Sequence, residues 1–282
     1  MAYAAVQQIQ LGSVMNRENE AEAVLARAKA AGLAGIELNG FMIRPISMPV
    51  KMLTRAAGMP VGNGGKLDWH GIIRRSGMLV PSLHLTLGEV EKDPQAAAKE
   101  ALSFGAQYIT ITAMYRYDYR DPARVHELAK RLDAADEKLK AYGVRLLYHN
   151  HNIEFIKPEP GKTVYDILMD ETHIGFEFDS YWAVDAGADA AGIMETLGDR
   201  LRMYHINDRG CRLNKTPVTP ILKMDSMELG CGNLDLDRFI RIARQYAEAI
   251  IIESHRNFVN GDPVKSMEIS AKFLTKKLGE NA

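Results

Sequence analysis

The feature that most constrains the fold of this chain is a regular alternation of short apolar runs with longer stretches of helical spacing, repeated along the whole sequence. The runs expected to form strands are Val6–Val14, Gly35–Leu38, Val80–Leu87, Tyr108–Ala113, Val144–His149, Ile174–Asp179, Met203–Asn207 and Ala249–Glu253. The clearest helical stretches are Glu20–Ala31, Pro94–Phe104, Pro122–Tyr142 and Leu236–Tyr246. Such alternation predicts parallel strands joined by helical crossovers.

Residues at the ends of the helical stretches support these boundaries. Pro94 and Pro122 each follow an aspartate, which is the pattern of an N-cap residue followed by proline in the first turn. Gly32, Gly105 and Gly143 follow three of the stretches, as expected of glycines that end helices. The sequence therefore marks both ends of several helices.

The length and continuity of the chain favour one closed barrel. The 282 residues show no linker and no shift in composition, so we expect a single α/β domain spanning residues 1–282. A (β/α)8 TIM barrel typically needs about 250 residues. A doubly wound open sheet is the alternative, but the glycine-rich phosphate loop expected after its first strand is missing.

Composition excludes several classes of function. The formal net charge is -1, which gives no electrostatic footprint for nucleic acid or an anionic membrane surface. The two cysteines make no disulfide framework, and no signal peptide or membrane-spanning run is recognisable. We expect a soluble, cytoplasmic protein that binds neither nucleic acid nor membrane.

Ionisable residues occur where most of the expected strands end. The fifth strand runs into YHNHNIEF, Tyr148–Phe155, which places two histidines and a glutamate where turn-forming residues are usual. The other strand-end candidates are Glu37, His84, Glu177, Asp179, His205 and Glu253. Any one of these residues alone has an ordinary structural explanation, but their joint occurrence favours a site at the carboxyl ends of the strands.

The expected site has the composition of a metal centre. Strand alternation puts Glu177 on the same face as Asp179, and likewise groups the polar residues of the last two strands. Carboxylates gathered in a barrel interior would repel one another, and a divalent cation relieves that repulsion. Carboxylate and imidazole ligands together suit Mn, Fe, Co, Zn or Mg.

Several segments of the chain together resemble a known family. The residues that carry the resemblance are Gly35–Leu38, Ser82–His84, Tyr148–Phe155, Phe176–Asp189, Arg202–Gly210, Glu228–Phe239 and Ile250–Ser254. They resemble the sugar phosphate isomerase/epimerase family, with its xylose isomerase-like TIM barrel, over essentially the whole chain. Ketose 3-epimerases, hydroxypyruvate isomerase, inosose dehydratase and 3-dehydroshikimate dehydratase belong to this family, and homo-oligomers are common in it.

The resemblance implies one divalent metal ion held by Glu, Asp, His and Glu from strands five to eight. The last three ligands correspond to Asp179, His205 and Glu253. Many relatives have a glutamate at the end of strand five, where His149 stands in this chain. We therefore expect Glu154 to reach back to the metal, with His149 as the alternative ligand.

The resemblance also implies roles for other residues and a reaction. We expect Glu154 and Glu253 to act as acid and base, with His151 as a further acid/base candidate. The residues expected to contact the substrate are His84, His149, Glu37, Arg209 and Trp182. The expected activity in carbohydrate metabolism is metal-dependent isomerisation or epimerisation of a monosaccharide or keto-sugar derivative through an enediolate, with manganese among the expected metals. A lyase acting on an inosose or keto-glycoside, and a catalytically silent sugar-binding barrel, are the alternatives.

Overall fold

The computed structural model describes residues 2–46, 48, 52, 62, 64–114, 116–213 and 216–280. Its barrel strands are β1 Tyr3–Gln7, β2 Gly35–Asn39, β3 Leu83–Leu85, β4 Tyr108–Ile111, β5 Arg145–His149, β6 Gly175–Asp179, β7 Leu201–Ile206 and β10 Ala249–Ile252. They follow the order β1-β10-β7-β6-β5-β4-β3-β2 in a closed barrel. This closed α/β barrel confirms the predicted (β/α)8 fold.

Helices connect these strands, and one small hairpin stands apart from the barrel. The helices are α1 Glu18–Ala30, α2 Gly40–Ile43, α4 Trp69–Ser76, α5 Leu87–Lys92, α6 Pro94–Ser103, α7 Pro122–Lys140, α8 Val164–Glu171, α9 Ser180–Asp185, α10 Ala190–Leu197, α11 Leu236–Tyr246 and α12 Pro263–Gly279. β8 Asp208–Gly210 pairs antiparallel with β9 Asp225–Met227. None of the helices in the described ranges combines the length and apolar character needed to span a bilayer.

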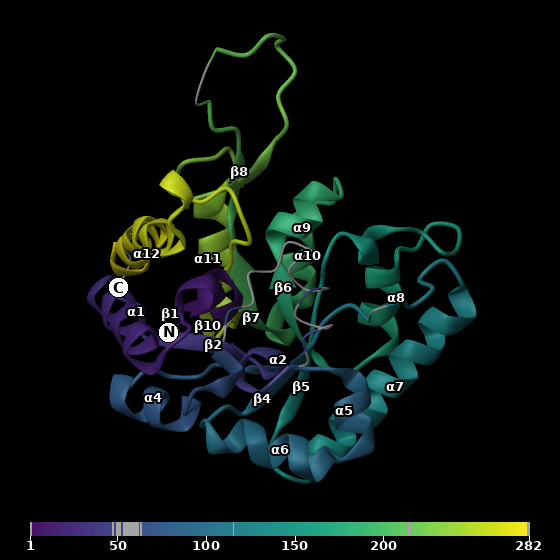
Figure 1. The fold of residues 1–282 in the computed structure, drawn as a ribbon. Coiled ribbons are helices and arrows are strands. Elements are labelled where there is room, and N and C mark those ends of the chain that lie inside the picture. The colour runs from purple at the N-terminus through teal and green to yellow at the C-terminus, as the bar shows by residue number, and fades with distance from the viewer. Residues whose placement is uncertain are drawn as a thin grey trace. The chain divides into compact units, whose positions relative to one another are not determined.

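Two compact units make up the chain. Unit 1 comprises Met1–Ala2, Leu79–His205 and Ile242–Ala249, and unit 2 comprises Tyr3–Met78, Ile206–Arg241 and Ile250–Ala282. In unit 1, α6 and α7 lie along the outer side of β4 and β5 (Figure 1). The expectation of a single domain over residues 1–282 stays a prediction.

Helix ends follow the predicted chemistry. The side chain of Asp93 accepts a hydrogen bond from Ala96 N at 2.9 Å, and Asp121 does the same for Ala123 N at 3.0 Å, each just before the proline of the first turn. Such N-caps satisfy amide groups that have no partner inside the helix. Gly105, after α6, has a φ of +80°, which is the left-handed conformation that glycine adopts most easily.

The first strand was predicted in the wrong place. Residues of the expected strand Val6–Val14 form the end of β1 and then a 3-10 helix, Gln8–Val14. The Oε1 atom of Gln7 accepts hydrogen bonds from Ile9 N at 2.9 Å and from the Asn39 side chain at 2.6 Å. Because this side chain accepts the hydrogen bond of the next turn's amide, the chain leaves the sheet at Gln7.

Candidate active site

Three neighbouring strands of unit 1 carry ionisable side chains at their carboxyl ends. His149 is the last residue of β5, Asp179 is the last residue of β6, and His205 is next to the last residue of β7. The register pairs His149 with Glu177 and Asp179 with His205, so β6 lies between the two histidine strands. The exposed fraction of none of these four residues exceeds 2%. These side chains lie at the end of the strands where TIM barrels carry their active sites.

His149, Asp179 and His205 fit a divalent cation. One ligand atom from each lies within 4.8 Å of those of the other two, close enough for all three to bind one ion. Nδ1 of His149 is buried and has no aligned hydrogen-bond partner among the described residues. Imidazole and carboxylate are ligands that Mn, Fe, Co and Zn accept in proteins. The structure therefore brings together two predicted metal ligands, together with the alternative ligand from strand five.

Asn150 fixes the position of Asp179. Its side-chain amide donates to Asp179 O at 3.0 Å, and its Oδ1 accepts from Asp179 N at 2.9 Å. The Asp179 carboxylate in turn accepts from Trp182 N at 3.1 Å, as the N-cap of α9. These bonds lock the end of β6 to the residue that follows β5, so the Asp179 carboxylate is held in place by the backbone around it.

Glu177 lies in the middle of the histidines, and sequence reasoning assigned it no role. Its Oε1 lies 2.9 Å from Nε2 of His84, 3.1 Å from Nδ1 of His149 and 3.1 Å from Nε2 of His205. Burial alone would raise the pKa of Glu177, but the surrounding imidazoles outweigh it and hold this pKa well below its ordinary value. The strand alternation that placed Glu177 on the face of Asp179 was the available signal.

Glu154 makes its hydrogen bonds within the turn that follows β5, and its expected role as a metal ligand stays a prediction. It lies in the 3-10 turn Ile153–Phe155 and is completely buried. Its carboxylate accepts hydrogen bonds from the Tyr148 hydroxyl at 2.7 Å and from His151 N at 2.8 Å. Burial raises the pKa of Glu154 to about 7, although both bonds act in the opposite direction. Among the described residues, the grouping that could hold an ion at this end of β5 contains His149 and not Glu154.

The remaining predicted residues of unit 1 surround His149. The ring of His151 lies 5.0 Å from the His149 ring and 5.6 Å from Trp182, measured between centroids. The His84 ring lies 5.8 Å from His149. Four of the residues expected to bind substrate or transfer protons therefore lie beside one another.

A model of the family described as "xylose isomerase-like TIM barrel" matches residues 25–277. The chain belongs to the xylose isomerase-like TIM barrel family. This membership confirms the resemblance found in the sequence. A search of curated proteins gave no match.

Solved structures share the fold of this xylose isomerase-like barrel at low sequence identity. A sugar phosphate isomerase/epimerase from Parabacteroides distasonis is 19% identical with a TM-score of 0.72, covering 96% of this chain and 92% of its own. A probable 3-DHS dehydratase, AsbF, from Bacillus anthracis is 14% identical with a TM-score of 0.67, covering 98% and 99%. The IolI protein with a bound zinc atom is 12% identical with a TM-score of 0.65, covering 99% and 98%.

The predicted site residues Glu37, Arg209 and Glu253 belong to unit 2. Glu37 in β2 is fully buried and accepts a hydrogen bond from the Gln7 side chain at 3.1 Å. Arg209 lies in β8, and Glu253 directly follows β10, with Oε1 3.6 Å from Nε2 of His255. The roles of these three residues in the site stay predictions.

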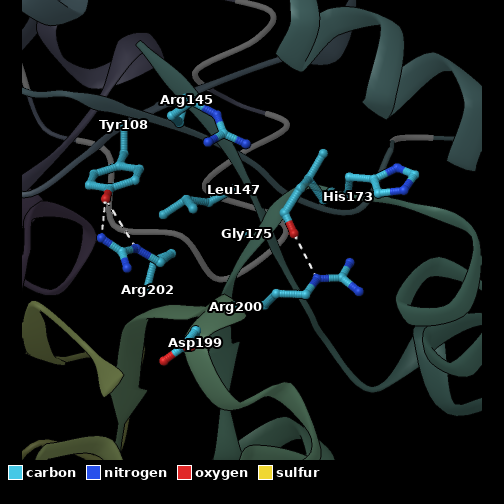
Figure 2. Close-up of a pocket in the computed structure, with 9 residues that line it drawn as sticks. Tyr108, Arg145, Leu147, His173, Gly175, Asp199, Arg200 and Arg202 are labelled. Carbon is cyan, nitrogen blue, oxygen red and sulfur yellow. Dashed lines mark hydrogen bonds between the residues drawn. The ribbon is translucent and has the colours of Figure 1, made fainter. Parts of the chain in front are cut away.

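A cavity of about 330 Å³ opens at the other end of the barrel strands of unit 1. Figure 2 shows its lining, which includes the residues that begin β4, β5 and β6. The Arg202 guanidinium bonds the Tyr108 hydroxyl and pairs with Glu248, while that of Arg200 donates to Ile174 O at 3.0 Å. These groups have partners within the fold, and xylose isomerase-like barrels, as TIM barrels, carry chemistry at the opposite end.

Proposed function

We propose that this chain is a divalent-metal-dependent isomerase or epimerase that acts on a monosaccharide or keto-sugar derivative through an enediolate. The observation that carries the proposal is the grouping of buried His149, Asp179 and His205 at the carboxyl ends of three adjacent strands. Membership of a family whose structural neighbours include sugar isomerases and epimerases supports it.

One divalent cation completes the proposed site, with Asp179, His205 and Glu253 as ligands. We take His149 as the ligand from strand five, because its ring lies with the other ligands while both oxygens of Glu154 have hydrogen-bond partners. Mn, Co, Zn, Fe and Mg are all candidates, because the neighbours with a bound ion include IolI with zinc and a barrel from Mycobacterium smegmatis with magnesium. When bound, the cation would polarise a carbonyl and stabilise developing negative charge on oxygen.

The side chains around the proposed metal ligands would transfer the protons. Glu154 is the proposed acid/base residue with the most direct support, because a pKa of about 7 allows its carboxyl group to accept and return a proton near neutral pH. Glu253 is the proposed second acid/base residue, and His151 is a further candidate. His84, Trp182, Glu37 and Arg209 would orient the sugar hydroxyls.

The product depends on the carbon to which the proton returns and on the face from which it arrives. If it returns to the same carbon from the opposite side, the sugar is epimerised. If it is delivered to the neighbouring carbon, an aldose and a ketose interconvert. Loss of a leaving group from the same intermediate would instead be a lyase reaction. Because the fold is similar to that of AsbF, a probable dehydratase, the experiment below also tests for a lyase.

Exchange of a carbon-bound proton with solvent tests all of these reactions at once. The purified protein, loaded with Mn, Co or Zn, is incubated in D2O with free and phosphorylated ketoses and with inososes, and deuterium incorporation is followed by NMR. We expect incorporation next to the carbonyl in the wild type and its loss in Asp179→Asn. Asp170→Asn is the matched control, because Asp170 is an exposed residue paired with Lys162.

The products distinguish the proposal from its rivals. A substrate that exchanges and keeps its mass supports an isomerase or epimerase, whereas loss of water or an aglycone shows a lyase. Sugar binding without exchange under any of the metals would contradict catalysis and leave a silent sugar-binding barrel.

A further inference from the structure

Three imidazole nitrogens of unit 1 converge on one carboxylate oxygen of Glu177. Oε1 of Glu177 lies 2.9 Å from His84 Nε2, 3.1 Å from His149 Nδ1 and 3.1 Å from His205 Nε2. None of the four side chains is more than 7% exposed. Glu177 precedes Asp179 by two residues on the same face of β6, so its Cα lies about 6.6 Å further down the strand than that of Asp179.

The carboxylate is oriented so that one oxygen faces the imidazoles. Its other oxygen, Oε2, lies 3.0 Å from the Thr110 hydroxyl and 3.4 Å from the Ser82 hydroxyl. Those two hydroxyls are themselves 2.9 Å apart. Hydrogen bonds therefore hold Oε2 in place, and Oε1 is left pointing at the three rings.

The contacts at Oε1 are short but lack hydrogen-bond alignment. Neither Oε1 of Glu177 nor Nδ1 of His149 has an aligned hydrogen-bond partner among the described residues. Two adjacent ligands bound at about 2.1 Å to an octahedral ion lie about 3.0 Å apart, and each points at the ion instead of at its neighbour. The three observed separations from Oε1 match that spacing. Leaving buried polar atoms without partners is otherwise costly.

We propose that Glu177 is a direct cation ligand and that, with His84, His149 and His205, it forms an inner position where the cation rests before substrate binds. This inference rests on the proposed function, because the inner position shares His149 and His205 with the set that contains Asp179. The two positions are alternatives for one ion. Three imidazoles and one carboxylate favour Zn, Co, Fe or Mn over Mg, which prefers oxygen ligands.

Counting the imidazole ligands tests the inner position without relying on activity. X-ray absorption at the zinc edge, on the zinc-loaded and substrate-free protein, should show three imidazoles per ion in the wild type. It should show two in His84→Asn. The proposed set of His149, Asp179, His205 and Glu253 would give two in both proteins.

Zinc affinity provides the second measurement. Loss of an outer hydrogen-bonding partner typically weakens metal binding about 10- to 100-fold, so loss of a direct ligand in Glu177→Gln should exceed about 100-fold. Thr110→Val is the matched control, because it removes a hydroxyl at Oε2 and leaves Oε1 in place. We expect it to fall within the smaller range.

The outcomes separate this inference from the proposed function. The inner position would be overturned if the wild type showed two imidazoles per ion and His84→Asn showed the same number, while Glu177→Gln kept its zinc affinity. If solvent exchange of the sugar proton persists in that case, the proposed function stands without it. A wild type that binds no zinc, cobalt, iron or manganese would overturn both.

Discussion

Replacing Glu154 by glutamine should change how the stability of this protein depends on pH. Burial raises the pKa of Glu154 from 4.5 to about 7 in the folded chain, whereas the unfolded chain returns it to its ordinary value. Between these two values the folded state holds a proton that the unfolded state has released. Unfolding then releases a proton, so stability must fall as the pH rises through this window.

The size of the effect follows from the two pKa values. Each unit of difference corresponds to about 1.4 kcal/mol, so a difference of about 2.5 units gives about 3.5 kcal/mol in all. This contribution is fully present below pH 4.5 and is lost once the pH passes about 7. The Glu154→Gln variant has no titrating group at this position, so it does not lose this contribution to stability as the pH rises.

The assay is urea unfolding of metal-free wild type and Glu154→Gln at several pH values between about 5 and about 8. Removing metal matters because a bound cation would lower the pKa of nearby carboxyl groups. The difference in unfolding free energy between the two proteins isolates Glu154 from every other titrating group. We expect the wild type to lose about 3 kcal/mol relative to the variant across the window.

Glu137→Gln serves as the control, since the Glu137 side chain is 69% exposed and lies on α7. It should follow the wild type at every pH. If the stability of the wild type and Glu154→Gln changed in parallel from pH 5 to pH 8, Glu154 would have no raised pKa, and its selection as the acid/base residue would lose its physical basis.

Two further changes should have defined effects. Tyr148→Phe removes the hydroxyl that donates to Glu154, so the pKa of Glu154 should rise further and the pH window found in the same unfolding assay should move upward. Gly230→Ala should cost more stability than Gly261→Ala in denaturant unfolding: both glycines have positive φ values, of +81° and +71°, but only a Cβ at Gly230 meets another group, the Phe273 ring at 2.6 Å. We expect about 1 kcal/mol for Gly261→Ala and about 2 kcal/mol more for Gly230→Ala, and equal losses would refute the steric argument.

Local chemistry explains why most of the barrel could be predicted from the sequence. Helix α11 was expected at Leu236–Tyr246 and begins and ends there, because its apolar spacing is regular throughout. The first strand was misplaced because Val6–Val14 carries apolar residues at strand-like intervals, while the Gln7 side chain ends the strand by accepting from Ile9 N. The Gln7 side chain is held there by a second hydrogen bond, from the Asn39 side chain. That contact joins residues far apart in the sequence and leaves no local pattern.

Contacts between residues that leave no local sequence pattern also limited the prediction of the site. The strand-end pattern predicted Asp179 and His205 as site candidates, and the structure places both at the carboxyl ends of their strands. The choice between His149 and Glu154 depended on the turn after β5, where His151 N and the Tyr148 hydroxyl bond the Glu154 carboxylate. Which way a loop carboxylate turns is decided by such three-dimensional partners, so residue spacing left both ligands open.

The position of Glu177 gives the histidine at the end of strand five a physical explanation. The resemblance implies that relatives with glutamate at that strand end hold their metal with three carboxylates and one imidazole. In this chain, His149 reduces the negative charge of the predicted set by one. The register places Glu177 directly beside His149, and Oε1 of its carboxylate lies within 3.1 Å of a nitrogen of each of three imidazoles. In the proposed inner position, Glu177 of strand six would supply the negative charge that strand five lacks, and His84 would add one more imidazole. A site with more imidazole and fewer carboxylate ligands should bind transition ions more tightly than Mg. We therefore expect metal preference to be the property in which this chain differs most from relatives that have the glutamate.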